Sequence, residues 1–250
     1  NAWNEWAEGA VLEPDHGLGY SYLNATRRSL LIQSRSQDID IPTQPCVIIH
    51  VWYLDVFDEI LFALKASGIK WRIFITTIPE HEDELRKHLI ANDMACESLL
   101  VGENRGRDIL PFLRAATLLR DQGVDVVLKL HTKRSTHRND GDQWREELVN
   151  RLLMRGRASA ILHAFSKQPS LGLVAPEGHI HPLTFYWGAN VDNVFALSSL
   201  IGIPTPNVHA ENFTSGSMFW IRLQALSPIL DASLNEHMFE NEAGQVDGTL

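Results

Sequence analysis

Apolar residues form short continuous runs that alternate with helix-like segments between residues 46 and 130. The runs predict strands, because continuous apolar stretches of this kind are typical of strands buried on both faces. The segments between them repeat apolar residues at a helical period, which predicts amphipathic helices. The predicted strands cover residues 46–53, 71–77, 97–101 and 124–130, and the predicted helices cover residues 55–67, 80–92 and 107–122. This order predicts an α/β fold with a mostly parallel sheet and helices on both faces.

Polar side chains gather directly after the predicted strands. Ligands of open parallel sheets bind beyond the carboxyl ends of the strands, so these positions form the candidate ligand site. The candidates are His50 and Tyr53 after the first strand, Thr76 and Thr77 after the second, Asn104, Arg105, Gly106, Arg107 and Asp108 after the third, and His131, Thr132, Lys133 and Arg134 after the fourth. The last two groups are rich in cations and hydrogen-bond donors, which suits them to phosphate oxygens. The alternative interpretation is structural: a solvated strand end at His131 and Lys133, and a helix start next to Asp108.

The charge of the chain limits the class of partner. The 250 residues are 44% hydrophobic and carry a formal net charge of −9. This acidic balance argues against a nucleic-acid-binding surface, so the basic cluster at residues 131–134 is a local feature. Cys46 and Cys96 lie in apolar surroundings without a metal-ligand spacing, which indicates neither zinc nor a disulfide framework. No apolar run reaches the roughly 20 residues of a membrane span, and we expect a cytoplasmic protein.

The basic positions predict a diphosphate site that works without a divalent metal. A unit positive charge about 4 Å from a phosphate oxygen gains roughly 4 kcal/mol at an effective dielectric constant near 20, so two or three such groups replace a metal ion. No Asp-x-Asp lies near residues 124–130, and neither GxxxxGKS/T nor GxGxxG occurs, which disfavours a P-loop or a usual dinucleotide site. His179 and His181 have the spacing of one strand face, but without an obvious third ligand they are interpreted as loop residues rather than a metal site.

Several ordered motifs resemble one family. They are NRGRDILPFL (104–113), LKLHTKRSTH (128–137), LGLVAPEGH (171–179), FTSGSMFWIR (213–222) and GQVDGTL (244–250). From about residue 45 to the end, this set resembles the rhamnan synthesis protein F family, sugar transferases of bacterial cell-wall and O-antigen polysaccharides. The resemblance implies a GT-A-like nucleotide-sugar fold, a donor such as dTDP-rhamnose, and a lipid-linked or growing polysaccharide as acceptor. LHTKR stands where most GT-A enzymes carry a metal-binding Asp-x-Asp, so metal dependence is left open.

The resemblance also implies an acceptor side. FTSGSMFWIR looks like the acceptor-side glycine strand of such transferases, which makes Gly216 and Ser217 acceptor-side candidates. A tight strand bend is the alternative interpretation of these two residues. Trp187 and Trp220 are candidates for stacking on a sugar ring, whereas Trp144 is interpreted as a packing residue.

A second resemblance covers the first 25 or so residues. WNEWAEG followed by LEPD is similar to the last barrel strand of glycoside hydrolase family 99-like domains, in which the two glutamates of the motif are linked to acid/base chemistry. They correspond to Glu5 and Glu8, and we expect both to be inactive because a lone strand forms no barrel. We predict a barrel remnant at residues 1–25, a linker at 26–45 and a glycosyltransferase domain at 46–250. The motif at the start and GQVDGTL at the end lead us to expect a fragment of a longer polypeptide.

Three functions from different classes fit the sequence. The first is a glycosyltransferase using a nucleotide-activated deoxyhexose, with Asp247 as the base of an inverting transfer and Glu242 as the second choice. An ordinary Asp-Gly turn is the alternative interpretation of Asp247. The second function is a non-catalytic module that binds a glycan or a nucleotide-sugar for a fused upstream domain. The third is a hydrolase, which only the NEWAEG motif supports. We expect a cytoplasmic location, with peripheral association with the inner membrane kept as an alternative.

Overall fold

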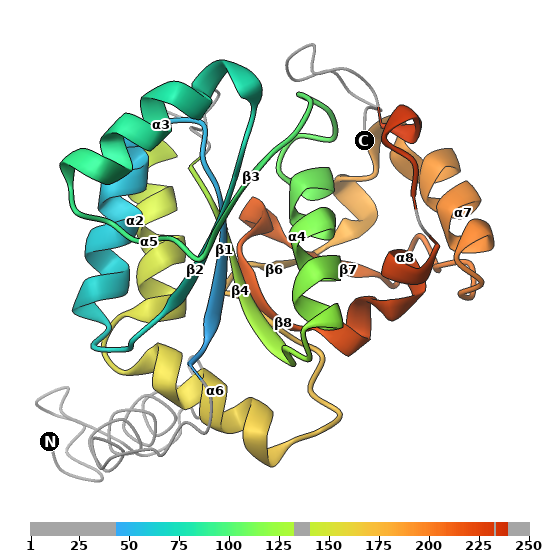
Figure 1. Ribbon diagram of the computed structural model, residues 1–250. Coiled ribbons are helices and arrows are strands. Elements are labelled where there is room, and N and C mark those ends of the chain that lie inside the picture. Colours follow the sequence, from blue (N-terminus) through green and yellow to red (C-terminus); the bar gives the residue numbers. More distant parts are fainter. Residues whose placement is uncertain (1–43, 133–140, 233, 240–250) are drawn as a thin grey trace, which may run out of the picture.

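The computed structural model describes residues 44–132, 141–232 and 234–239, which form an α/β structure (Figure 1). Strands and helices alternate in its first part. They are β1 (Cys46–His50), α2 (Leu54–Ala66), β2 (Arg72–Thr77), α3 (Pro79–Ala91), β3 (Ser98–Val101), α4 (Ile109–Asp121) and β4 (Val126–His131). Each element coincides with a predicted one, with ends that differ by no more than about three residues.

The second part of the described chain adds helices and shorter strands. They are α5 (Gly141–Leu153), α6 (Arg157–Lys167), β5 (Leu173–Val174), β6 (Ile180–Pro182), α7 (Val191–Leu200), β7 (Asn212–Thr214), β8 (Phe219–Arg222) and α8 (Ser227–Asp231). Short 3-10 helices lie at η2 (Leu183–Phe185), η3 (Gly188–Asn190), η4 (Ser215–Ser217), η5 (Leu223–Leu226) and η6 (Glu236–Met238).

The main sheet has six strands in the order β3-β2-β1-β4-β8-β5. β3, β2, β1 and β4 run parallel, and β8 runs antiparallel to both of its neighbours. β6 and β7 form a separate antiparallel pair. The predicted mostly parallel sheet is therefore confirmed. Figure 1 shows the main sheet between α2, α3 and α5 on one side and α4 and α8 on the other.

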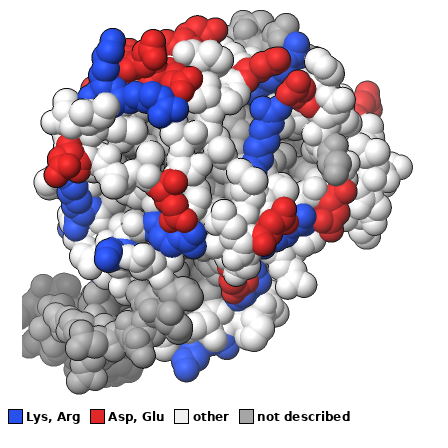
Figure 2. Space-filling model, in the orientation of Figure 1, with Lys and Arg blue, Asp and Glu red and all other residues white. Residues whose placement is uncertain are grey.

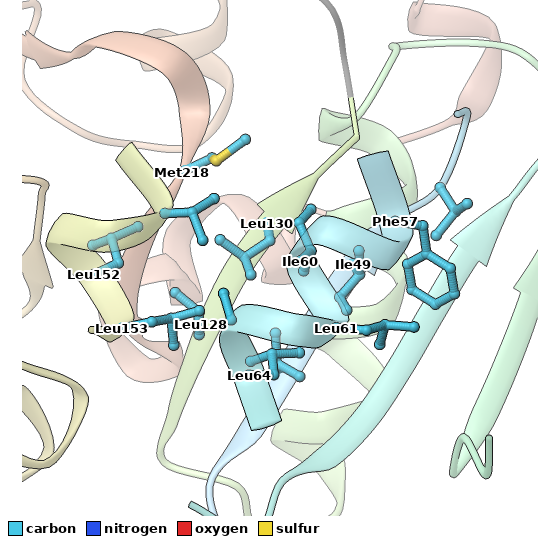
Figure 3. Close-up of a cluster of buried hydrophobic side chains, with 14 of the residues drawn as sticks. Ile49, Phe57, Ile60, Leu61, Leu64, Leu128, Leu130, Leu152, Leu153 and Met218 are labelled. Atoms are coloured by element: carbon cyan, nitrogen blue, oxygen red, sulfur yellow. The ribbon is translucent and has the colours of Figure 1, made fainter. Parts of the chain in front are cut away.

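Alternation along the central strands builds a core on each face of the sheet. Val47 and Ile49 of β1 belong to the cluster that includes α2 and α5, while Ile48 belongs to the cluster that includes α4. Successive side chains of a strand point to opposite faces, so a strand that is apolar throughout fills both layers. Figure 3 shows the first cluster, in which Ile49, Leu128 and Leu130 meet side chains of α2 and α5.

Two predicted element ends are shifted for local reasons. β1 ends at His50 rather than residue 53, because the amide groups of Trp52 and Tyr53 donate to the hydroxyl of Thr132 (2.7 and 2.9 Å) and turn the chain into α2. α4 begins at Ile109 rather than residue 107, because Arg107 has a left-handed backbone with φ of +50°. A left-handed residue cannot continue into a right-handed helix.

Three further features describe the molecule as a whole. None of the helices formed by the described residues is long and apolar enough to cross a membrane. Cys46 is buried and Cys96 is half-buried, and both are free thiols. Acidic and basic side chains lie in small mixed groups on the face shown in Figure 2.

Candidate functional site

The order of the parallel strands creates a switch point between β1 and β4. From β1 the chain proceeds through α2, β2 and α3 to β3 on one side, and then crosses over through α4 to β4 on the other side of β1. The connections on the two sides of this point lie on opposite faces of the sheet, with α2 on one face and α4 on the other. Ligands of open α/β sheets bind at such a point. The carboxyl ends of β1 and β4 are therefore the candidate site.

Two histidines lie at this switch point. His50 and His131 are the last residues of β1 and β4 and are partners in the strand register. Both are buried, with 8% and 6% of their surface exposed. His50 Nδ1 is 3.0 Å from the hydroxyl of Thr76, at the end of β2. His131 Nε2 donates to the carbonyl oxygen of Gly216 (2.8 Å) and ties β4 to the turn before β8.

Burial keeps the imidazole of His50 neutral. Desolvation lowers the pKa of His50 to about 4, although the carboxylate of Asp108 acts in the opposite direction. A neutral imidazole has one donor nitrogen and one acceptor nitrogen, so at neutral pH His50 offers hydrogen bonds rather than charge.

A buried ion pair lies beside the histidines. The ammonium group of Lys129 in β4 donates to a carboxylate oxygen of Asp108, to the carbonyl oxygen of Ser217 (2.7 Å) and to the Ser217 hydroxyl (2.8 Å). The Ser217 hydroxyl also donates to the same Asp108 oxygen (3.0 Å). The aromatic rings of Phe112 and Phe219 each lie 5.5 Å from the ammonium nitrogen. Lys129 is only 1% exposed, so its charge depends on these partners.

The pair holds Asp108 in its ionised form. Burial alone would raise the pKa of Asp108, but the ammonium of Lys129 and the hydrogen bonds from Lys129 and Ser217 hold it well below its ordinary value. Burial lowers the pKa of Lys129, and Asp108 opposes that change. A carboxylate with such a low pKa is a poor proton acceptor. We infer that Asp108 positions other groups and does not act as a general base.

Two left-handed turns meet at the ion pair. Gly106 and Arg107 precede Asp108 with φ of +60° and +50°, and Gly216 and Ser217 precede β8 with φ of +82° and +54°. Such backbone is rare for a residue other than glycine, and strain of this kind concentrates at functional sites. Lys129 binds Asp108, which follows the first turn, and Ser217, which ends the second. It thereby joins the β3–α4 loop to the β7–β8 turn.

Both turns need glycine because their backbones are closely packed. A Cβ at Gly106 would lie 2.6 Å from the ring of Phe239. A Cβ at Gly216 would lie 2.5 Å from the Leu148 side chain and 3.1 Å from the indole of Trp144. Gly216 and Ser217 lie in a tight turn before β8.

Several predicted donor-site residues have structural contacts in the described chain. Thr132 is fully buried, and its hydroxyl accepts the amides of Trp52 and Tyr53. The hydroxyl of Thr77 donates to the carbonyl oxygen of Val51 (2.8 Å). These contacts fix the β1–α2 loop beside the switch point. Tyr53 is half-buried and directly precedes α2.

The β3–α4 loop contributes Asn104 and Arg105, which are both half-buried. The guanidinium of Arg105 donates to Glu103 (3.0 Å) and to the carbonyl oxygen of Phe239 (2.9 Å). Arg105 therefore anchors Phe239 at the carboxyl edge of the sheet, where Phe239 also contacts the backbone of Gly106.

The two tryptophans predicted on the acceptor side lie in the interior. Trp220 is fully buried, its ring lies 5.5 Å from that of Trp71, and its indole N–H donates to the carbonyl oxygen of Leu152. Trp187 is 8% exposed and donates to the carbonyl oxygen of Val208 (2.8 Å). The burial of Trp220 leaves no ring face for a sugar, so this residue is corrected to a core residue.

Other predicted residues lie outside the described ranges. They are Lys133 and Arg134 after β4, Glu242 and Asp247 near the end, and Glu5 and Glu8 near the start. Their proposed roles stay predictions, as do the boundaries of the barrel remnant and the linker.

Lys129 is the site residue that the sequence interpretation missed. A signal exists in the strand itself, because Leu128 and Leu130 point to the α2 side while Lys129 and His131 occupy the alternate positions. A lysine in the middle of a strand that is otherwise buried requires a buried counter-ion.

Three helices of the parallel part begin at the carboxyl edge of the sheet. α2, α3 and α4 each begin just after a parallel strand, so their positive dipole ends lie at the carboxyl edge. Within the described ranges, no group of three or more His, Cys, Asp or Glu side chains is placed to hold a metal ion.

Two family models and two curated relatives match the chain. A family model described as rhamnan synthesis protein F matches residues 15–250, and one described as glycosyltransferase WbsX matches residues 1–26. Two relatives described as uncharacterized protein WxcX, from strains B100 and ATCC 33913 of Xanthomonas campestris pv. campestris, are each 50% identical over 254 residues. The match covers all of this chain but only 36% of each relative, so the chain spans about a third of their length. No solved structure matches the chain.

Proposed function

The chain belongs to the rhamnan synthesis protein F family, and from this premise we propose that it is a glycosyltransferase domain of bacterial cell-surface polysaccharide synthesis. In this proposal it has a GT-A-like fold, binds a nucleotide-diphospho-deoxyhexose such as dTDP-rhamnose, and transfers the sugar to a lipid-linked or growing glycan. It acts in the cytoplasm, with a peripheral position at the inner membrane as the alternative.

The switch point between β1 and β4 is the observation that carries the proposal. His50 and His131 end the two strands at this point, and the buried Asp108–Lys129 pair lies beside them. Helix N-termini at the same edge favour a negatively charged ligand. A nucleoside diphosphate fits these groups, because its phosphates accept hydrogen bonds and the helix N-termini at the carboxyl edge of the sheet stabilise its negative charge.

The proposed cations come directly after β4. Lys133 and Arg134 follow Thr132 in the chain, and they hold the diphosphate together with donors from the β3–α4 loop. Each full charge about 4 Å from a phosphate oxygen contributes roughly 4 kcal/mol at an effective dielectric constant near 20. Such charges stabilise the leaving diphosphate without a divalent metal.

The proposed transfer is a single inverting displacement. The acceptor hydroxyl oxygen bonds to the anomeric carbon, its proton passes to the carboxylate of Asp247, and the bond from the anomeric carbon to the diphosphate breaks with its electron pair on the diphosphate oxygen. Asp108 is unsuited to this task because its pKa is held low in the ion pair. Glu242 is the second candidate, three residues along the chain from Phe239, which Arg105 anchors at the carboxyl edge.

The donor assignment is tested by calorimetric titration of the full-length protein with dTDP-rhamnose in EDTA. We expect binding to persist in the chelator. Loss of binding in EDTA and its return with manganese would show that the site depends on a metal and that the cationic assignment is wrong.

The catalytic assignment is tested by transfer to a lipid-linked glycan with product detection by mass spectrometry. Asp247→Asn should reduce turnover by roughly 10² or more and leave donor affinity nearly unchanged, which is the effect of losing a general base. Glu242→Gln is the matched comparison. A nearly normal turnover of Asp247→Asn together with a slow Glu242→Gln would move the assignment to Glu242.

A second candidate function is a non-catalytic module that binds a glycan or a nucleotide-sugar. The observation in its favour is that the buried carboxylate at the switch point, Asp108, is committed to Lys129. Such a module would bind dTDP-rhamnose but show no transfer with any acceptor.

A further inference from the structure

A continuous row of aromatic and imidazole rings begins at the β7–β8 turn. We call it the ring row; its members are Trp144, His179, His181, Tyr186 and Phe213. Neighbouring ring centres lie 6.2 Å apart for Trp144 and His179, 6.4 Å for His179 and His181, 6.2 Å for His181 and Phe213, and 5.0 Å for Tyr186 and Phe213. The row therefore connects α5 to the β6–β7 pair and to the end of η2.

The inner end of the ring row is part of the candidate site. Trp144 packs so closely on Gly216 that a Cβ there would lie 3.1 Å from its indole. The carbonyl oxygen of the same Gly216 accepts the hydrogen bond from His131 at the end of β4. The backbone of Gly216 therefore lies between His131 and the inner end of the ring row.

The strand register explains why the rings line up. His179 directly precedes β6 and His181 lies within it, so alternation places both imidazoles on one face. His181 pairs with Phe213 of β7 across the two strands. Cross-strand neighbours of this kind keep their side chains in contact.

Polar groups lie along the inner half of the row. His179 Nε2 lies 4.0 Å from the carboxylate of Glu147, which Arg151 holds by two hydrogen bonds. His179 Nδ1 lies 3.4 Å from the hydroxyl of Ser215. At the outer end Tyr186 is 58% exposed, while its ring also packs on His181 and Phe213.

We propose that the ring row is the binding subsite for the acceptor glycan. The inference rests on the proposed transferase function and deepens it by naming the acceptor residues. A pyranose ring has an apolar face of C–H groups that packs on an aromatic ring, and hydroxyl groups at its edge that need polar partners. Tyr186 and Phe213 offer the stacking surface, and Glu147 and His179 offer the partners nearer the reaction centre.

The same features disfavour other occupants. An apolar peptide would take the Glu147 carboxylate, whose side chain is 46% exposed, out of water without offering it a hydrogen bond. A metal ion would need a set of His, Cys, Asp or Glu ligands that the described residues do not assemble there. A glycan satisfies both the rings and the polar groups.

The test measures binding of a linear rhamnose tetrasaccharide to the full-length protein by saturation-transfer NMR and by fluorescence titration. We expect Tyr186→Ala and Phe213→Leu each to weaken this binding about fivefold or more, because each removes a stacking surface. Phe62→Ala is the matched control: Phe62 is 73% exposed on α2 and lies outside the ring row, so the affinity should stay within about twofold. Circular dichroism establishes that each variant is folded.

Donor binding separates this inference from the function on which it rests. Calorimetry with dTDP-rhamnose should give the same affinity for the unsubstituted protein and for both ring-row variants. Two results would overturn the ring-row assignment alone, provided that donor binding is normal. One is an unchanged tetrasaccharide affinity in the folded variants, and the other is the absence of tetrasaccharide binding by the unsubstituted protein. If the protein binds no donor but does bind the tetrasaccharide, and Tyr186→Ala weakens that binding, the transferase proposal is overturned and the glycan subsite is supported.

Discussion

The two ends of the same sheet carry ion pairs of opposite character. At the amino edge, Arg72 at the start of β2 pairs with Glu97 just before β3, and their side chains are 28% and 40% exposed. Near the carboxyl edge, Lys129 pairs with Asp108, and the side chains are 1% and 12% exposed. An exposed pair contributes little free energy because water solvates both charges well, whereas a buried pair must offset the desolvation of two ions.

This difference indicates why the buried pair exists. Well-packed apolar residues often match or exceed the stability that a buried ion pair gives, so stability alone does not explain Lys129 in an apolar strand. The pair joins the two left-handed turns on either side of the switch point. In the proposed function, the pair positions these turns for the ligand.

Breaking the buried pair should have the largest effect. Lys129→Met leaves the Asp108 carboxylate buried without its cation, so the free energy of unfolding should fall by about 3–5 kcal/mol in chemical denaturation. Lys65→Met, at an exposed lysine of α2, is the matched control and should change it by about 0.5 kcal/mol or less. Equal stability of the two variants would contradict a desolvated pair in the folded protein.

Acidification should act through His50 at the carboxyl edge. The pKa of His50 is about 4 in the folded protein and 6.5 ordinarily, so between these values the unfolded chain binds the extra proton. The stability that neutral His50 gives to the folded protein is fully present above about pH 6.5. It is lost as the pH falls towards 4, so the free energy of unfolding should drop by about 3 kcal/mol in total. His50→Asn should remove this part of the pH dependence, and His209→Asn, at an exposed histidine, serves as the control. An unchanged pH dependence in His50→Asn would show that His50 is solvated.

The glycine turns sharpen the comparison further. Gly216→Ala adds a Cβ to a residue at φ of +82° and places it 2.5 Å from Leu148, so the free energy of unfolding should fall by about 2–3 kcal/mol. Gly202→Ala is the matched control, because Gly202 has φ of +70° but no atom within 4 Å of the added Cβ, and about 1 kcal/mol is expected. Thermal or urea denaturation of both variants measures the difference, and similar losses would argue against close packing at Gly216.

The exposed pair should show the smallest effect. Arg72→Gln should lower the free energy of unfolding by less than about 1 kcal/mol, and 1 M salt should reduce the difference because it screens exposed charges. A loss as large as that of Lys129→Met would remove the contrast between the two ends of the sheet.

The sequence predicts the sheet well because its signals are local. Runs such as CVIIH and VVLKLH identify β1 and β4, and the rule for parallel sheets selects His50 and His131 at their ends. Apolar runs and helical periods need no knowledge of distant contacts.

The partnerships within the site are not visible in the sequence because they are long-range. Lys129 meets Asp108 across 21 positions and Ser217 across 88 positions, and no local pattern pairs them. For the same reason His179 and His181 read as loop residues, although their place in the ring row depends on Trp144 and Phe213. The sequence predicts Trp220 as a residue that stacks on a sugar, because aromatic residues are common both in hydrophobic cores and in glycan-binding sites.

A double substitution tests most directly whether the buried pair positions the ligand site. Asp108→Leu combined with Lys129→Met removes both charges together, so the free energy of unfolding should stay within about 2 kcal/mol of the unsubstituted protein. We predict that this folded variant binds dTDP-rhamnose at least about tenfold more weakly in calorimetry, because the two turns lose the contacts that join them. An affinity equal to that of the unsubstituted protein, in a variant of equal stability, would contradict the positioning role of the pair.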